Sequence, residues 1–194
     1  MTLNKFDTRK MVFLAILTAL VVVLQLLGSF IRFGTFSISL VLIPIAVGAA
    51  LCGPLGGAWL GLVFGAVVLI SGDASVFLAI NPAGTFITVL LKGALCGLAA
   101  GMVFNMLRSG NQTVAAIAAA VVCPIVNTGI FLIGCRLFFF DTIKEWANGT
   151  NAFVFMITGF VGLNFVFELI VNVVLSPVIV RLVDYVSPKR NDDR

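Results

Sequence analysis

The stretch that decides the fold is Asn81–Leu107, NPAGTFITVLLKGALCGLAAGMVFNML. It is long and apolar enough to cross a bilayer, because a membrane-spanning helix needs about 20 predominantly apolar residues. Lys92 stands near its middle, where a lysine costs roughly 2.5–3.5 kcal/mol on insertion scales and requires a partner, a wet cavity or a ligand. The polar positions recur at helical spacing and so share one face of the helix: Asn81, Thr85, Thr88 and Lys92.

The composition of the whole chain agrees with this segment. Hydrophobic residues make up 61% of the 194 residues and charged residues 10%, whereas a soluble domain is about half apolar and about a quarter charged. The length leaves room for about six spans with short loops and for no sizeable soluble domain. We therefore expect an all-α bundle of six transmembrane helices that forms a single transmembrane domain over residues 1–194, with spans at about 10–30, 38–52, 55–72, 82–107, 113–138 and 153–183.

The basic residues indicate the orientation of the bundle, since cytoplasmic loops of membrane proteins carry an excess of Lys and Arg. With six crossings, the opposite side receives Arg32 and Lys144, with Arg136 near the boundary. We therefore expect both termini in the cytoplasm and interpret the basic excess as a topology signal rather than a nucleic-acid site. The side of the termini receives Lys5, Arg9, Lys10, Arg108, Arg181, Lys189, Arg190 and Arg194.

Several kinds of chemistry find no support in the sequence. Histidine is absent, which removes imidazole bases and most zinc or copper sites. The four cysteines lie singly inside apolar runs, without metal-ligand spacing, and are expected to be small buried packing residues. No G-x-x-x-x-G-K-[ST] segment for phosphate binding is present. We therefore expect no enzyme, no metal and no cofactor.

The segment around the second and third spans is rich in glycine. Gly53-Pro54 is the strongest break in the first half of the chain and separates these two spans. Gly53, Gly57, Gly61 and Gly65 follow at strict i+4 intervals, and such stripes let two helices approach closely in lipid. The stripe predicts either a helix contact inside the fold or an interface with another subunit.

Polar residues of the last two spans are expected at a similar depth to Lys92. Glu168 lies about as far from the start of its span as Lys92 does from Asn81, and Asn164, Glu168 and Asn172 share one face. Lys92 and Glu168 form either an internal ion pair or the floor of an outward polar pocket under loops 31–37 and 71–81. The pocket would be lined by Asn81, Thr85, Thr88, Lys92, Asn127, Asn164 and Glu168.

A family resemblance rests on three segments: IPIAVGAALCGPLGGAWLGLVFG at Ile43–Gly65, NPAGTF at Asn81–Phe86 and PIVNTGIF at Pro124–Phe131. With its size and six-span pattern, the chain resembles the substrate-binding S components of energy-coupling factor (ECF) vitamin transporters, in the branch that includes pantothenate and folate binders. An Ala-x-x-x-Ala motif in the first helix, here Ala15 and Ala19, is a second hallmark of that family.

The resemblance implies a multi-pass protein of a prokaryotic plasma membrane that captures a vitamin with high affinity. It implies docking through Ala15 and Ala19 on a transmembrane coupling subunit, which works with two cytosolic ATPase subunits. It also implies that a loop between the first two helices closes over the ligand, and this maps to Arg32, Phe33, Gly34 and Phe36.

The ligand itself is less constrained by the sequence. A carboxylate vitamin such as pantothenate suits a pocket with a cation from Lys92 or Arg136 and amides from Asn81, Asn127 and Asn164, because charge-assisted hydrogen bonds are strong. Arg136 lies about 180° around the helix from Asn127, so we rank Asn127 above it.

Two other functions remain open from the sequence. An autonomous small secondary transporter or channel would use Lys92 and Glu168 as an intramembrane relay, although no inverted repeat with broken helices is visible. A purely structural membrane subunit would bind no ligand.

Overall fold

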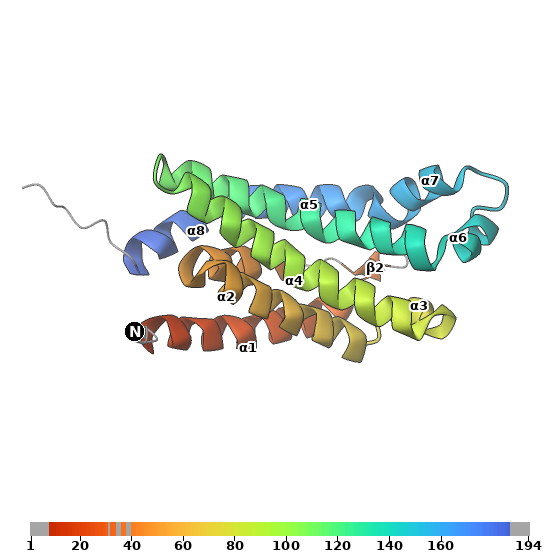
Figure 1. Cartoon of the computed structure of the whole chain (residues 1–194), viewed down its shortest axis with the longest axis horizontal. Coiled ribbons are helices and arrows are strands. Elements are labelled where there is room, and N and C mark those ends of the chain that lie inside the picture. The colour runs from red at the N-terminus through yellow and green to blue at the C-terminus, as the bar shows by residue number, and fades with distance from the viewer. Residues whose placement is uncertain (1–7, 31, 34–35, 38–39, 187–194) are drawn as a thin grey trace, which may run out of the picture.

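The computed structural model describes residues 8–30, 32–33, 36–37 and 40–186, and it is almost entirely helical (Figure 1). The two strands are two residues long each and form one antiparallel hairpin. The all-α class is therefore confirmed. The elements are α1 (Thr8–Phe30), β1 (Arg32–Phe33), β2 (Phe36–Ser37), α2 (Leu42–Ile70), α3 (Ser75–Ile80), α4 (Pro82–Leu107), α5 (Gln112–Phe138), α6 (Phe140–Trp146), α7 (Ala152–Phe155), the π-helix η1 (Met156–Val161) and α8 (Gly162–Val186).

Within the described ranges of the chain, five helices are long and apolar enough to cross a membrane. The candidate spans are Thr8–Ser29, Leu42–Ile70, Pro82–Leu107, Gln112–Phe138 and Phe165–Val183. The helices lie roughly along the long axis of the molecule, and the start of α1 and the end of α8 lie at the same end (Figure 1). The hairpin, α3, α6 and α7 lie at the other end, which we call the cap end.

The chain reverses direction inside α2. Gly53 has φ 81° and ψ −178°, a backbone conformation that favours glycine, and Pro54 follows it as the first residue of a new helical arm. Gly57 packs against Ala49, and Leu60 against Gly48, although a straight helix would separate positions 49 and 57 by about 12 Å. Thus α2 consists of two antiparallel arms, 42–52 and 54–70, as the Gly53-Pro54 break predicts.

The glycine stripe of the second arm lies against α4. A Cβ atom at Gly61 would collide with the carbonyl oxygen of Gly93, one at Gly93 with that of Gly61, and Gly57 and Gly97 repeat this arrangement one turn further on. The two backbones therefore touch directly. The prediction of a contact inside the fold is confirmed, and the alternative of an interface with another subunit is wrong for this stripe.

The buried side chains form two clusters. The larger one joins α1, α2, α4, α5 and α8. The smaller one lies at the cap end and is centred on Cys135, Phe139, Ile143 and Met156. Cys96, Cys123 and Cys135 are buried and Cys52 is half-buried, which agrees with the expected packing role.

The last predicted span, about 153–183, is not one continuous helix. It is divided into α7, the π-helical turn η1 and α8, and Gly162 has φ 27° at the junction. The run through this junction stays mostly apolar, with Thr158 and Asn164 as its polar residues, so the length of the run did not reveal the break.

Candidate functional site

The polar face of α4 is built as its spacing predicts, and its first members also stabilise the helix start. Asn81 is the N-cap, and its Oδ1 accepts a hydrogen bond from the Gly84 N–H at 3.0 Å. The Thr85 hydroxyl donates to the Asn81 carbonyl at 2.8 Å. Thr85 and Thr88 are 2% and 4% exposed, so this face points into the bundle.

Lys92 extends from the same face between α2 and α5. Its Nζ lies 5.5 Å from the ring centroid of Phe64 and 5.4 Å from that of Phe131, within the range of a cation–π interaction. Glu168 of α8 lies close enough to Lys92 for an electrostatic attraction. Among the residues that the structure describes, none accepts a hydrogen bond from Lys92.

Glu168 and Asn172 form the buried polar face of α8. They are 8% and 2% exposed, and the Asn172 amide donates to the Glu168 carbonyl at 2.8 Å. Their shared face agrees with the i, i+4 spacing. The side chain of Asn164, predicted for the same face, lies outside the described residues.

In the part of the chain that the structure describes, three buried polar side-chain atoms have no hydrogen-bond partner: Thr88 Oγ1, Asn127 Oδ1 and Asn172 Oδ1. Leaving such an atom unpaired costs about 1–3 kcal/mol, and unpaired buried groups in a native fold require an explanation. A bound ligand or water would supply it. Arg136 is exposed and stacks over Phe140 at 4.0 Å, so it faces away from Asn127, as the helical geometry predicts.

A hydrogen-bonded cluster at the cap end was not predicted from the sequence. Asp73 Oδ2 accepts from Gln25 Nε2 at 2.7 Å, from the Ser29 hydroxyl at 2.6 Å and from the Ser71 hydroxyl at 3.2 Å. The cluster ties the end of α1 to the α2–α3 turn. The sequence did contain a sign of this cluster, because Asp73 is the only acidic residue between Asp7 and Asp141.

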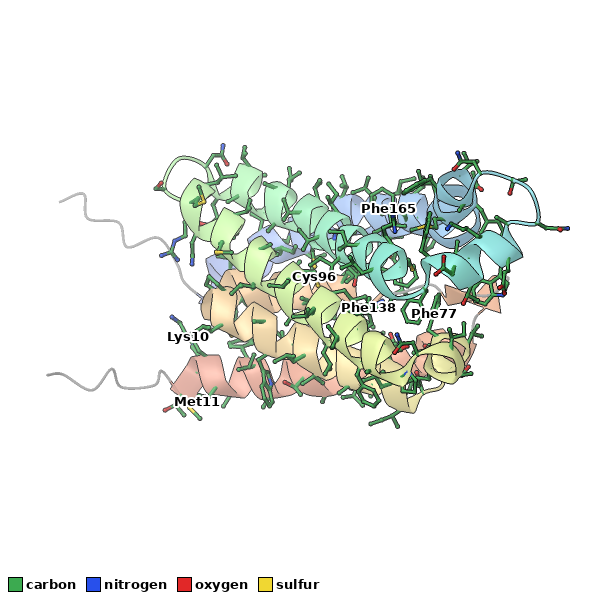
Figure 2. All side chains as sticks on the ribbon, turned by 45° about the vertical axis from the view of Figure 1, so that its right-hand side comes forward. Lys10, Met11, Phe77, Cys96, Phe138 and Phe165 are labelled. Carbon is green, nitrogen blue, oxygen red and sulfur yellow. The ribbon has the colours of Figure 1, made fainter. Side chains whose placement is uncertain are left out.

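The aromatic residues of the cap end also form a cluster that the sequence did not reveal. Phe77 of α3 makes edge-to-face contacts with Phe131 at 5.7 Å, Phe139 at 5.0 Å and Trp146 at 6.2 Å. Figure 2 shows Phe77 between α3 and the α5–α6 region, at the end away from Lys10. Because Phe131 also contacts Lys92, aromatic rings continue from the buried cation to Trp146, which is 37% exposed.

The sequence of the chain matches a known protein family. The family model for the substrate-specific component of ECF transporters matches residues 9–180. The chain belongs to this family. Neither a curated protein nor a solved structure matches the chain. The matched residues include the candidate site, and the family is a substrate-binding part of a transporter rather than a class of enzyme.

The predicted gating loop of this substrate-specific component is a short hairpin at the cap end. Arg32 pairs with Ser37 and Phe33 with Phe36. Gly34 lies outside the described residues, as do the side chains of Arg32, Phe33 and Phe36. The hairpin lies at the same end of the bundle as α3 and α6 (Figure 1), and its role over a ligand stays a prediction.

The predicted docking residues of the substrate-specific component lie on the surface of α1. Ala15 and Ala19 are exposed, and the neighbouring Ile16 and Leu20 are 58% and 42% exposed. Small residues between large ones leave a shallow groove that another helix can approach. The surface is therefore free for a partner, and docking itself stays a prediction.

Proposed function

We propose that the chain captures a water-soluble vitamin or related micronutrient with high affinity and delivers it to the cytoplasm as the S component of an ATP-driven ECF transporter. The observation that carries the proposal is the polar face of α4 inside the bundle. Among the described residues, Lys92 has no hydrogen-bond acceptor, and the buried Thr88 Oγ1 one turn away has no partner. Polar groups of this kind in a membrane mark substrate pathways. The partners are a transmembrane coupling subunit and two cytosolic ATPase subunits.

The proposed topology has six crossings of a prokaryotic plasma membrane, because the two arms of α2 run in opposite directions. The first arm has about half the length of a full crossing, about 16 Å for its 11 residues. Arg9 and Lys10 at the start of α1, Arg108 just after α4 and Arg181 near the end of α8 are exposed. These helix ends lie away from the cap end (Figure 1), whereas Lys144 belongs to α6 at the cap end. The excess of basic residues supports cytoplasmic termini and an extracellular cap end.

The proposed site lies below the cap end. Thr85, Thr88, Lys92, Asn127 and Glu168 are its inner residues, Asn81 and Asn164 complete it, and the 32–37 hairpin closes over it. The proposed ligand is a small water-soluble nutrient, with a carboxylate vitamin such as pantothenate as the first candidate, because Lys92 supplies a cation and Asn127 an amide to such a pocket. An autonomous transporter is not favoured, because the matched family is a substrate-binding component.

The docking surface gives the experiment that tests this function. Ala15→Trp and Ala19→Trp should reduce cellular uptake at least tenfold and leave ligand binding by the purified chain unchanged, because a bulky ring fills the groove and does not reach the interior. The matched control is Ile133→Trp, which alters an equally exposed position on α5 and should leave uptake intact. Normal uptake in both alanine variants would contradict the docking role.

A further inference from the structure

The Asp73 carboxylate joins two parts of the cap end that lie far apart in the sequence. Its Oδ2 accepts hydrogen bonds from Gln25 Nε2 at 2.7 Å and from the Ser29 hydroxyl at 2.6 Å, both near the end of α1. The same oxygen accepts from the Ser71 hydroxyl at 3.2 Å within its own turn. Hydrogen bonds to an ionised acceptor are stronger than those between neutral groups. The turn 71–74 is therefore fixed to the end of α1.

The short helix α3 follows this turn directly and lies between the two buried clusters. Its N-cap residue Ala74 and the side chain of Leu78 belong to the larger cluster, whereas Phe77 packs against the smaller one. α3 has six residues, none of them buried, and this is fewer than two helical turns. Because so short a helix has little stability of its own, its position depends on its neighbours.

Phe77 extends these contacts to the candidate site. Its ring makes edge-to-face contacts with Phe131 at 5.7 Å, with Phe139 at 5.0 Å and with Trp146 at 6.2 Å. Phe139 stands at the junction of α5 and α6, so α3 packs on both helices there. The ring of Phe131 in turn lies 5.4 Å from Lys92 Nζ. A displacement of α3 would thus remove a packing partner of the ring that lies against the buried lysine.

We infer that Asp73 is a positioning residue for the candidate site: it fixes the turn before α3, and α3 then holds Phe77 against Phe131 and Trp146. The bearing of this role on nutrient binding rests on the proposed function, whereas the positioning itself is a property of the chain without ligand. A simpler role for Asp73 is to hold α1 on the bundle. In that case the contacts of Phe77 would not change when Asp73 is replaced.

The fluorescence of Trp146 distinguishes the two roles. The chain contains two tryptophans, so Trp59→Phe leaves Trp146, which is 37% exposed, as the only one. In this background, quenching of the purified full-length chain by acrylamide measures the accessibility of the Trp146 indole. Asp73→Ala should raise the quenching constant at least about 1.5-fold, because the contacts around α3 open locally. Phe77→Ala, which removes the ring itself, should raise the constant at least as much.

A double variant decides whether Asp73 acts through Phe77. Asp73→Ala should have no further effect on quenching in a Phe77→Ala chain, because the ring that Asp73 positions is already absent. Asp73→Asn keeps an acceptor oxygen and should cause a smaller rise than Asp73→Ala. Gln25→Met removes one donor to Asp73 and should also raise quenching, which supplies a test if Asp73→Ala does not fold. The control is Asp141→Asn, an exposed carboxylate on the helix of Trp146, which should leave the quenching constant unchanged.

Unchanged quenching in folded Asp73→Ala, with a raised value in Phe77→Ala, would limit Asp73 to holding α1 and overturn the inference. Equal effects of Asp73→Ala with and without the Phe77 ring would overturn it as well. An unchanged value in Phe77→Ala would do the same, because the ring would then not cover Trp146. No ligand enters these measurements, so failure of every water-soluble vitamin to bind would count against the proposed function and leave the positioning role standing.

Discussion

At the scale of single residues, Lys92 lies inside the bundle between the rings of Phe64 and Phe131, and none of the described residues accepts a hydrogen bond from it. The depth of Lys92 and the shared face of Thr85 and Thr88 could be predicted, because both follow from helical spacing alone. The rings of Phe64 and Phe131 could not be assigned among eighteen phenylalanines. Their contacts with Lys92 depend on how three helices pack.

Replacing Lys92 tests its role directly. Lys92→Met should raise the Kd of the bound nutrient tenfold or more, about 1.4 kcal/mol or more, because a hydrogen bond from a charged group is lost. Titration of the purified protein measures this change. Lys144→Met is the control, since Lys144 is exposed and pairs with Asp141 at 3.2 Å. An unaltered Kd in a folded Lys92→Met protein would assign Lys92 a purely structural role.

At the scale of elements, the close contact between α2 and α4 holds the polar face of α4 in place. The stripe on α2 was visible in the sequence because its spacing is regular. Its counterpart on α4 includes Gly93 and Gly97, which the sequence analysis did not single out as a stripe. The break at Gly162 and the Asp73 cluster were missed for a different reason, since an unbroken apolar run hides the first and long-range contacts create the second.

Two glycine-to-alanine substitutions distinguish the effect of close backbone contact on stability from the effect of helix propensity. Gly61→Ala should lower the free energy of unfolding by about 2 kcal/mol or more, because its Cβ would collide with the Gly93 backbone. Gly129→Ala on α5 should be neutral or stabilising by up to about 1 kcal/mol, because no atom lies within 4 Å of an added Cβ. Reversible unfolding in detergent measures both. Equal effects would show that the α2–α4 contact is looser than described.

At the scale of the whole molecule, composition and span length were sufficient to predict a membrane bundle, and the Gly53-Pro54 break indicated where the chain reverses. The basic residues and the even number of predicted spans also indicated that both termini lie on one side. The start of α1 and the end of α8 lie at one end of the molecule, and the hairpin, α3, α6 and α7 gather at the other (Figure 1). In the proposed function, capture takes place at the cap end and α1 offers a separate exposed surface to a partner.

The most direct measurement of the central claim is native mass spectrometry of the purified chain with a panel of water-soluble vitamins, followed by titration of any ligand that is retained. The proposed function predicts saturable one-to-one binding by the chain alone, with submicromolar affinity on the order of −8 kcal/mol or stronger. It also predicts that Lys92→Met retains less of the bound mass at the same ligand concentration, in line with its higher Kd. A folded chain that retains no vitamin at any concentration tested would contradict the claim.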